Sequence, residues 1–332
     1  MKPFLVKTFQ GLFFLTLAGL LLFLSFRGVD AEGFLQEMLA ARYSWVLLSM
    51  VFALASFFFR GYRWLMLVDS LGYKGRGMNA YHAVILGYTA NFAFPRLGEV
   101  FRCAVLNQLD GIPVDRLLGT VIVERLFDVL MLGLITLGFM ALEPEMLLRF
   151  LPGLAGNLEV PDQEFIGKIM VGIVSALLLL VAAWFLFNRI FPRNRFRRRV
   201  YLLFRGIYSG LRSAWKMKQR VLFLLATAGI WGCYFMMTYT LFQALDVTSG
   251  LGFSQAMFVL VIASFAFVVP AQGGIGSYHL VVSLGLTLFG ISREDGLLFA
   301  TLSHGSQTLF TLLLGLISFY VFVRKKRKLR NV

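Results

Sequence analysis

Long apolar segments recur along the chain, and they constrain its fold more than any other feature. Six of them approach or exceed the roughly 20 residues that a helix needs to cross a bilayer: 9–26, 44–59 with an apolar continuation to about 68, 117–141, 167–187, 221–245 and 296–323. Only 15% of the residues are charged and 58% are hydrophobic, whereas soluble domains carry about 25% charged residues. The sequence therefore excludes a soluble enzyme, a disordered chain and a coiled coil. It predicts one all-α polytopic membrane domain over 1–332.

Two further apolar regions are interrupted. The region 79–110 is broken around Pro95, and the region 256–290 is broken by Pro-Ala-Gln-Gly-Gly-Ile-Gly at 270–276. Each arm has about 14 to 17 residues, or roughly 20–25 Å as helix, which is shorter than the hydrocarbon core of about 30 Å. These arms are thus too short to predict as full spans.

Charged residues between the apolar segments predict the orientation of the chain. The loop 188–220 has eleven basic residues and no acidic one, and the tail from Arg324 has six basic residues. The loop 60–78 has four basic residues and one acidic, whereas 142–166 has one basic and five acidic. Because basic loops stay in the cytoplasm, both termini, 60–78 and 188–220 are expected there. We expect the protein to lie in the cytoplasmic (inner) membrane of a bacterium.

The same rule predicts the side of the membrane from which each interrupted region enters the bilayer. The hairpin 79–110 lies between a cytoplasmic loop and a helix that starts in the cytoplasm, so it enters and leaves from that side. The hairpin 256–290 lies between two external loops and enters from outside. The sequence thus predicts about six full transmembrane helices plus two oppositely oriented re-entrant helical hairpins. The alternative is that one hairpin crosses the bilayer fully.

The two hairpins resemble each other at their tips. Both have an aromatic-rich half-helix, then Pro-x-x-Gly starting at Pro95 or Pro270, then a second half-helix. Interrupted segments at matching places in two halves indicate an inverted repeat and a transporter site. Non-helical backbone at membrane depth needs protein or water around it. We therefore expect both tips to face a shared polar cavity, although Pro-x-x-Gly can also be an ordinary turn.

Charged side chains lie in or beside apolar segments of the first half. They are Arg96, Glu99, Arg102, Glu124, Arg125 and Asp128. A charge at the centre of a membrane helix costs about 2.5–3.5 kcal/mol on insertion scales. Two interpretations follow: a structural network of ion pairs, or a site where arginines bind an anionic headgroup and carboxylates orient them. Three arginines against three acids predict a nearly neutral resting site.

The second tip offers different groups. Gly273, Gly274 and Gly276 expose backbone N–H groups at a helix start, which is a potential anion nest, and Gln272 and His279 add polar side chains. Close helix packing and a hydrogen-bonded core histidine are the alternatives. These residues complete the predicted substrate-binding set.

A basic segment at 193–220 has an amphipathic pattern. Apolar residues recur at helical spacing from Val200 to Trp215, flanked by Arg and Lys. This pattern predicts a helix on the cytoplasmic leaflet, held there by anionic lipid. Cys103 and Cys233 are in no metal-binding spacing, and no cofactor is expected.

Three motifs carry a family resemblance. Pro95-Arg96-x-Gly98-Glu99-x-x-Arg102, Glu124-Arg125-x-x-Asp128 and Pro270-x-x-Gly-Gly-Ile-Gly resemble the flippase-like transmembrane domain of lysylphosphatidylglycerol synthases, over about residues 5–325. The resemblance implies the fold and lipid translocation. In that family a glutamate is common where this chain has His279. In the full synthase an aminoacyltransferase domain follows the membrane domain; we expect no lipid aminoacylation from the residues up to Val332.

These observations favour transbilayer translocation, by a flippase or scramblase, of an anionic lipid that is a phospholipid or is linked through polyprenyl phosphate. An integral-membrane enzyme acting on a lipid phosphate and a non-catalytic partner subunit remain alternatives. The chain has no HExxH or GxSxG motif, which argues against an enzyme. The net charge of +15 is explained by topology and lipid headgroups rather than nucleic acid. Expected partners are the lipid and the membrane, with a second copy or a lipid-biosynthesis enzyme left open.

Overall fold

The structure is a computed structural model that describes residues 16, 18–93, 97–146, 149–150, 217–267 and 272–330. The described residues form helices and turns without strands, as predicted. Beyond a helical segment at 18–26, the α-helices are α2 (Ala31–Ala40), α3 (Tyr43–Ser70), α4 (Gly77–Ala93), α5 (Gly98–Asp110), α6 (Val114–Leu142), α10 (Arg220–Phe242), α11 (Phe253–Ala266), α12 (Ser277–Thr287) and α13 (Arg293–Arg330). The predicted span 167–187 and nearly all of the basic segment 193–220 lie outside the described residues.

Four of the described helices are long and apolar enough to cross a membrane: α3, α6, α10 and α13. They coincide with four of the six predicted spans. The helix α13 has 38 residues and is longer than the predicted span 296–323, because it continues through the basic residues that follow Arg324.

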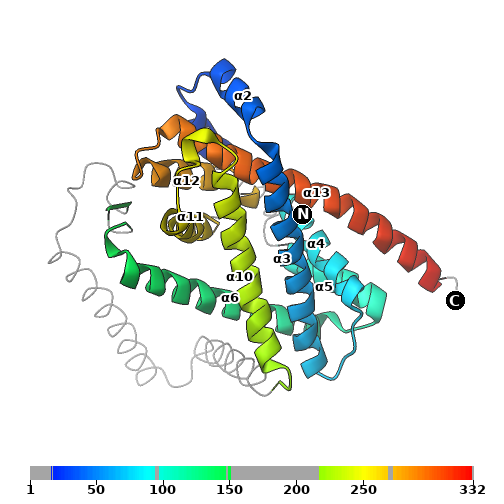
Figure 1. Cartoon of the computed structure of the whole chain (residues 1–332). Coiled ribbons are helices and arrows are strands. Elements are labelled where there is room, and N and C mark those ends of the chain that lie inside the picture. Colours follow the sequence, from blue (N-terminus) through cyan, green and yellow to red (C-terminus); the bar gives the residue numbers. More distant parts are fainter. Residues whose placement is uncertain are drawn as a thin grey trace, which may run out of the picture.

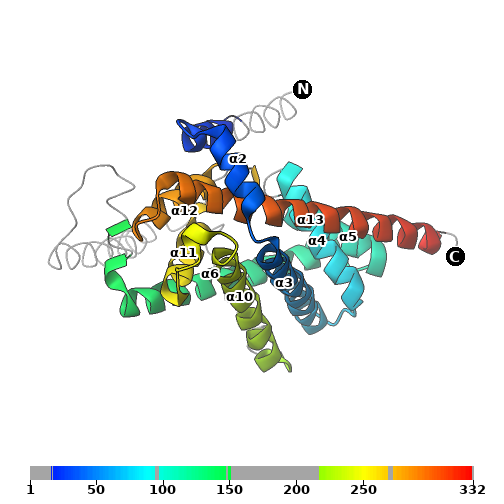
Figure 2. The same ribbon diagram turned by 45° about the horizontal axis from the view of Figure 1, so that its top comes forward.

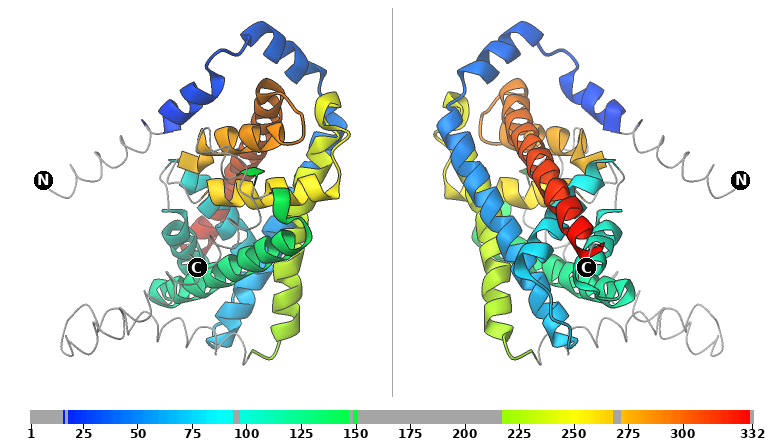
Figure 3. Two further views of the ribbon diagram at one scale, coloured as in Figure 1. Left: turned by 90° about the vertical axis from the view of Figure 1, so that its left-hand side faces the viewer. Right: turned by 90° about the vertical axis from the view of Figure 1, so that its right-hand side faces the viewer.

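The order of long and short helices repeats along the chain. Long α3, short α4 and α5 and long α6 are matched by long α10, short α11 and α12 and long α13. The helices α3 and α10 pack side by side and run antiparallel (Figures 1 and 3). Ser49 near the start of α3 donates to the carbonyl of Met237 near the end of α10 at 3.3 Å, and Arg63 near the end of α3 donates to Thr227 near the start of α10 at 3.3 Å. Opposite directions of the first helices are what an inverted repeat requires.

The last helix of each half packs against the hairpin of the other half. Helix α6 contacts α11, where the rings of Phe139 and Phe258 are 6.2 Å apart. Helix α13 contacts α4, where Gly315 lies directly against Thr89. Figure 2 shows α13 running from beside α12 to beside α4 and α5. The two halves are therefore interlocked.

Helices α4 and α5 form the first hairpin. Asp110 at the end of α5 accepts hydrogen bonds from the backbone of Arg76 at 3.0 Å and from the side chain of Asn79 at 2.6 Å, both at the start of α4. The chain therefore enters and leaves this hairpin at the same end. Closer to the tip, a side chain on Gly98 would collide with the carbonyl oxygen of Gly87, so glycine permits close contact of the two backbones.

Helices α11 and α12 form the second hairpin. The ring of Phe258 lies 5.4 Å from that of Phe289, and Gly285 packs against Ile262, so these helices also run antiparallel. At the tip, Gly273 packs against the ring of Phe92 from the first hairpin. The breaks predicted near Pro95 and Pro270 fall between the paired helices, although Pro95 and Pro270 themselves lie outside the described residues.

Two loops predicted from the sequence contain regular structure. Arg60 and Arg63, counted above with a cytoplasmic loop 60–78, are buried inside α3, and the connection to α4 is only residues 71–76. The expectation was wrong because carboxylates of α6 pair with these guanidinium groups, which allows α3 to continue past them. The segment 27–43, between the first two apolar segments, contains α2, whose first turn is capped by Asp30.

Candidate functional site: a buried arginine–carboxylate cluster

Glu124 on α6 is the centre of a buried charged cluster. Its carboxylate is fully buried and pairs with guanidinium groups from two other helices. Arg102 on α5 donates from Nη2 to Oε2 at 3.0 Å and from Nη1 to Oε1 at 3.4 Å. The Oε1 atom also lies 3.2 Å from Nη1 of Arg60 and 3.3 Å from Nη2 of Arg63, both on α3. One carboxylate thus joins three helices.

Asp128 extends the cluster by one helical turn. Its Oδ1 lies 2.7 Å from Nη2 of Arg63, and its Oδ2 lies 3.1 Å from Nη1 of Arg60. Glu124 and Asp128 are four residues apart on α6, so they share a face of the helix, as predicted. Arg60 and Arg63 therefore each bridge both carboxylates.

Aromatic and hydroxyl groups surround the arginines. Arg60 donates from Nε to the hydroxyl of Tyr234 on α10 at 2.7 Å, and its guanidinium lies 5.5 Å from the ring centroids of both Tyr88 and Tyr234. The guanidinium of Arg102 lies 4.7 Å from the ring of Trp64. Cation–π contacts gain strength where both partners are desolvated. The buried guanidinium groups are thus held by rings as well as by carboxylates.

The charge balance differs from the predicted one. Among the described residues, the cluster contains four arginines, with Arg125 as the fourth, against Glu99, Glu124 and Asp128, which leaves one positive charge in excess. Arg60 and Arg63 were missed because the apolar segment 44–59 ends directly before Arg60. Their spacing of three within an apolar stretch that resumes at Trp64 is the signal that points to them.

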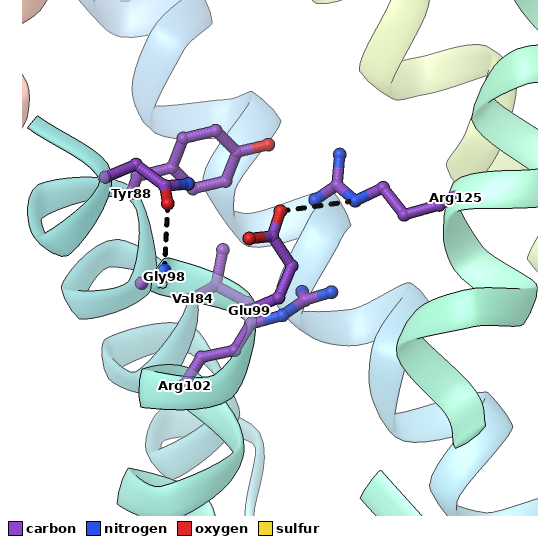
Figure 4. Close-up of a pocket in the computed structure, with 8 residues that line it drawn as sticks. Val84, Tyr88, Gly98, Glu99, Arg102 and Arg125 are labelled. Carbon is purple, nitrogen blue, oxygen red and sulfur yellow. Dashed lines mark hydrogen bonds and ion pairs between the residues drawn. The ribbon is translucent and has the colours of Figure 1, made fainter. Parts of the chain in front are cut away.

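Arg125 and Glu99 lie on the outer side of the cluster, where a crevice opens. Their side chains are 39% and 30% exposed, and Nε of Arg125 is 3.8 Å from Oε1 of Glu99. The crevice is narrow and open at its mouth. Figure 4 shows Arg125 reaching from α6 toward Glu99, with Tyr88 and Arg102 on opposite sides of Glu99. The lining residues are Val84, Gly87, Tyr88, Asn91, Gly98, Glu99, Arg102 and Arg125.

Asn91 ties the two arms of the hairpin together at this crevice. Its Oδ1 accepts a hydrogen bond from the backbone N–H of Gly98 at 2.8 Å. The remaining polar group of its side chain is the amide nitrogen, which can only donate. The crevice therefore presents an amide donor and two guanidinium groups, which is a set suited to an anion.

The second tip forms a separate polar group. Gly273, Gly274 and Gly276 all have positive φ, which glycine adopts without strain. His304 on α13 contacts the carbonyl of Gly273 through Nε2 at 2.8 Å, and the N–H of Gly276 donates to Nδ1 of His279 at 3.4 Å. The two imidazole rings are 5.2 Å apart. Part of the predicted anion nest is thus engaged in contacts within the tip.

The structure therefore brings together five of the predicted residues: Glu99, Arg102, Glu124, Arg125 and Asp128. His279 and the glycines of the second tip belong to the other group, which meets the first hairpin where Phe92 packs on Gly273. Arg96 and the side chain of Gln272 lie outside the described residues. Within the described residues, no group of three or more His, Cys, Asp or Glu side chains could hold a metal ion.

Comparison with known proteins identifies the family. A segment of 69 residues is 35% identical to a UPF0104 membrane protein of Methanocaldococcus jannaschii, and the match covers 20% of this chain and 20% of that protein. No solved structure matches the chain. Residues 11–315 match the family described as lysylphosphatidylglycerol synthase TM region. Because this match covers most of the chain, the protein is a multi-pass membrane protein that belongs to the family of lysylphosphatidylglycerol synthase transmembrane regions.

Proposed function

We propose that this protein moves an anionic membrane lipid from one leaflet to the other, with the headgroup passing the crevice between α4, α5 and α6. The excess positive charge of the cluster carries this proposal. In the part of the chain that the structure describes, four arginines face three carboxylates, so a bound phosphate diester neutralises this excess. The family, named for the membrane region of a lipid-synthesising enzyme, supports a lipid as the substrate.

Each arginine has a different role in this proposal. Arg125 and Arg102 line the crevice and contact the phosphate, because a planar guanidinium can make two parallel hydrogen bonds to it. Arg60 and Arg63 are positioning residues, since both pair with Glu124 and Asp128 and hold these carboxylates in place. We assign Arg96 and the tip from Gln272 to His279 to later contacts with the headgroup.

The proposed movement uses the repeat. We interpret the two hairpins as re-entrant from opposite sides, with both termini in the cytoplasm of a bacterial cell. Rocking of one half against the other along α3 and α10 then exposes the crevice to each side in turn. The acyl chains stay in the bilayer, because only the headgroup needs a polar path. No chemical step is proposed, and energy coupling by an ion gradient and simple scrambling are both compatible with this movement.

Reconstituted liposomes provide the test. Fluorescent phosphatidylglycerol and phosphatidylcholine are placed in both leaflets, and a membrane-impermeant reductant quenches the fraction that reaches the outer leaflet. We expect the protein to accelerate quenching of the anionic lipid, and Arg125→Gln to abolish most of this acceleration. Arg116→Gln is the matched control, because Arg116 lies on the same helix and is exposed.

The proposal is wrong if Arg125→Gln moves the anionic lipid as fast as the unmodified protein. Lipid extracts of the same liposomes separate the alternatives. A new lipid product indicates an enzyme, whereas an inactive protein that retains no anionic lipid on purification indicates a partner subunit.

A further inference from the structure

The ion pair between Glu99 and Arg125 is longer than the pairs that Glu124 and Asp128 make with Arg60, Arg63 and Arg102. Arg125 also lies 3.4 Å from Asp128 and 3.9 Å from Glu124. The contacts of Glu124 and Asp128 with Arg60, Arg63 and Arg102 have closest distances between 2.7 and 3.3 Å. The closest contact of Glu99 with Arg125 is 3.8 Å. Among the described residues, neither Nε of Arg125 nor Oε2 of Glu99 has a hydrogen-bond partner, although both atoms are buried. Glu99 is thus held near Arg125 by charge alone.

The place of Glu99 is the place that an anion would occupy. Its carboxylate lies in the crevice that Arg102 and Arg125 also line, and Arg125 reaches toward it (Figure 4). Glu99 lies in the first turn of α5, next to Gly98, whose backbone N–H donates to the side chain of Asn91 on α4. We infer that Glu99 is a resident anion that occupies the headgroup position and is displaced from Arg125 by the phosphate of the incoming lipid; this inference rests on the function proposed above.

Charge and hydrogen bonding make this exchange favourable. Without the Glu99 carboxylate the cluster has four arginines against two carboxylates, so its attraction for an anion increases. A phosphate has more acceptor oxygens than Glu99 uses here, and it can bond to two nitrogens of one guanidinium. It can also accept from the side-chain nitrogen of Asn91. Glu99 therefore competes with the ligand and keeps the empty site close to neutral.

Binding of a soluble, short-chain lipid tests the inference on the full-length protein in detergent. Dihexanoyl phosphatidylglycerol is titrated by calorimetry into the unmodified protein and into Glu99→Gln. Removal of a partly exposed ion-pair partner is expected to tighten binding by up to about fivefold, because such pairs contribute at most roughly 1 kcal/mol. Arg125→Gln is expected to weaken binding by at least about tenfold, because it removes charge-assisted hydrogen bonds.

Two further variants guard against loss of folding and unspecific charge effects. Glu99→Asp keeps the charge but shortens the side chain, so its affinity should fall between those of the unmodified protein and Glu99→Gln. Glu145→Gln removes an equal charge from an exposed pair with Arg149, and it should leave the affinity unchanged. Size-exclusion chromatography establishes that each variant is monodisperse before it is titrated.

The outcomes separate this inference from the proposed function. Equal or weaker binding by Glu99→Gln, together with weaker binding by Arg125→Gln, overturns the role of Glu99 and leaves the lipid site intact. If Arg125→Gln binds the lipid as tightly as the unmodified protein does, both the role of Glu99 and the proposed lipid site are wrong. Inorganic phosphate and dihexanoyl phosphatidylcholine are titrated in parallel. Tight binding of phosphate alone identifies a site for the free anion and overturns the lipid as ligand, whereas selective binding of the glycerol lipid supports it.

Discussion

Glu124→Gln is the substitution that should damage the protein most. The Glu124 carboxylate is fully buried and lies 3.0, 3.2 and 3.3 Å from nitrogens of Arg102, Arg60 and Arg63. At an effective dielectric constant of about 20, each of these contacts corresponds to roughly 5 kcal/mol of gross Coulomb attraction. Desolvation of each ion costs several kcal/mol and offsets most of this gain.

The net effect of the substitution follows from what it leaves behind. The glutamine side chain would present a neutral amide in place of the carboxylate, and the excess positive charge of the cluster would rise from one to two. Removing one partner of a buried pair costs about 3–5 kcal/mol, because the remaining charge is buried and uncompensated. We therefore expect a fall of roughly 10 °C in melting temperature, measured as the loss of monodisperse protein after heating in detergent.

A double-mutant cycle with Arg102→Gln tests the reason for this loss. Removing both charges of the Glu124–Arg102 pair should lower the free energy of unfolding by less than the sum of the two single substitutions. The difference should be about 0.5–3 kcal/mol. Strictly additive losses would show that Glu124 stabilises the fold by packing, and the electrostatic reasoning would then be refuted.

Three other predictions follow from the packing. Gly98→Ala should destabilise the protein by about 1–3 kcal/mol, because the methyl group would meet the Gly87 carbonyl, whereas Gly133→Ala, with open space around it, should change the melting temperature little. Single cysteines replacing Lys74 and Pro113 should react with an impermeant maleimide from the same side of the membrane, because Asp110 joins the two ends of the first hairpin; labelling from opposite sides contradicts the hairpin. His304→Leu should cost about 1–3 kcal/mol, because the Gly273 carbonyl loses its partner; in thermal melts His304→Gln, which retains a donor, should lose less.

Much of the charged cluster could be predicted from the sequence. Glu99, Arg102, Glu124 and Asp128 stand out because charged residues are rare in apolar segments. Spacings of three and four along a helix also place such residues on one face. Local sequence therefore predicted which residues share a helix face, and the structure brings these faces together.

The partners of these residues could not be predicted in the same way. Arg60 pairs with Asp128, 68 residues later in the chain, and no local pattern connects them. If a predicted span ends at its first charged residue, Arg60 and Arg63 are assigned to the following loop. In the structure both lie inside α3, because carboxylates of α6 pair with their guanidinium groups. The contact between His279 and His304 is likewise tertiary. The role of Arg96 stays a prediction.

The pairing of α3 with α6 has a consequence for the biogenesis of the protein. During synthesis at about 5–20 residues per second, the 68 residues between Arg60 and Asp128 take on the order of 3–14 s. Over that interval α3 carries two arginines without their carboxylates, and an unpaired charge costs about 2.5–3.5 kcal/mol on insertion scales when it lies at the bilayer centre. Integration of α3 at its final depth should therefore wait for α6, and a nascent chain released before Glu124 should leave α3 poorly inserted.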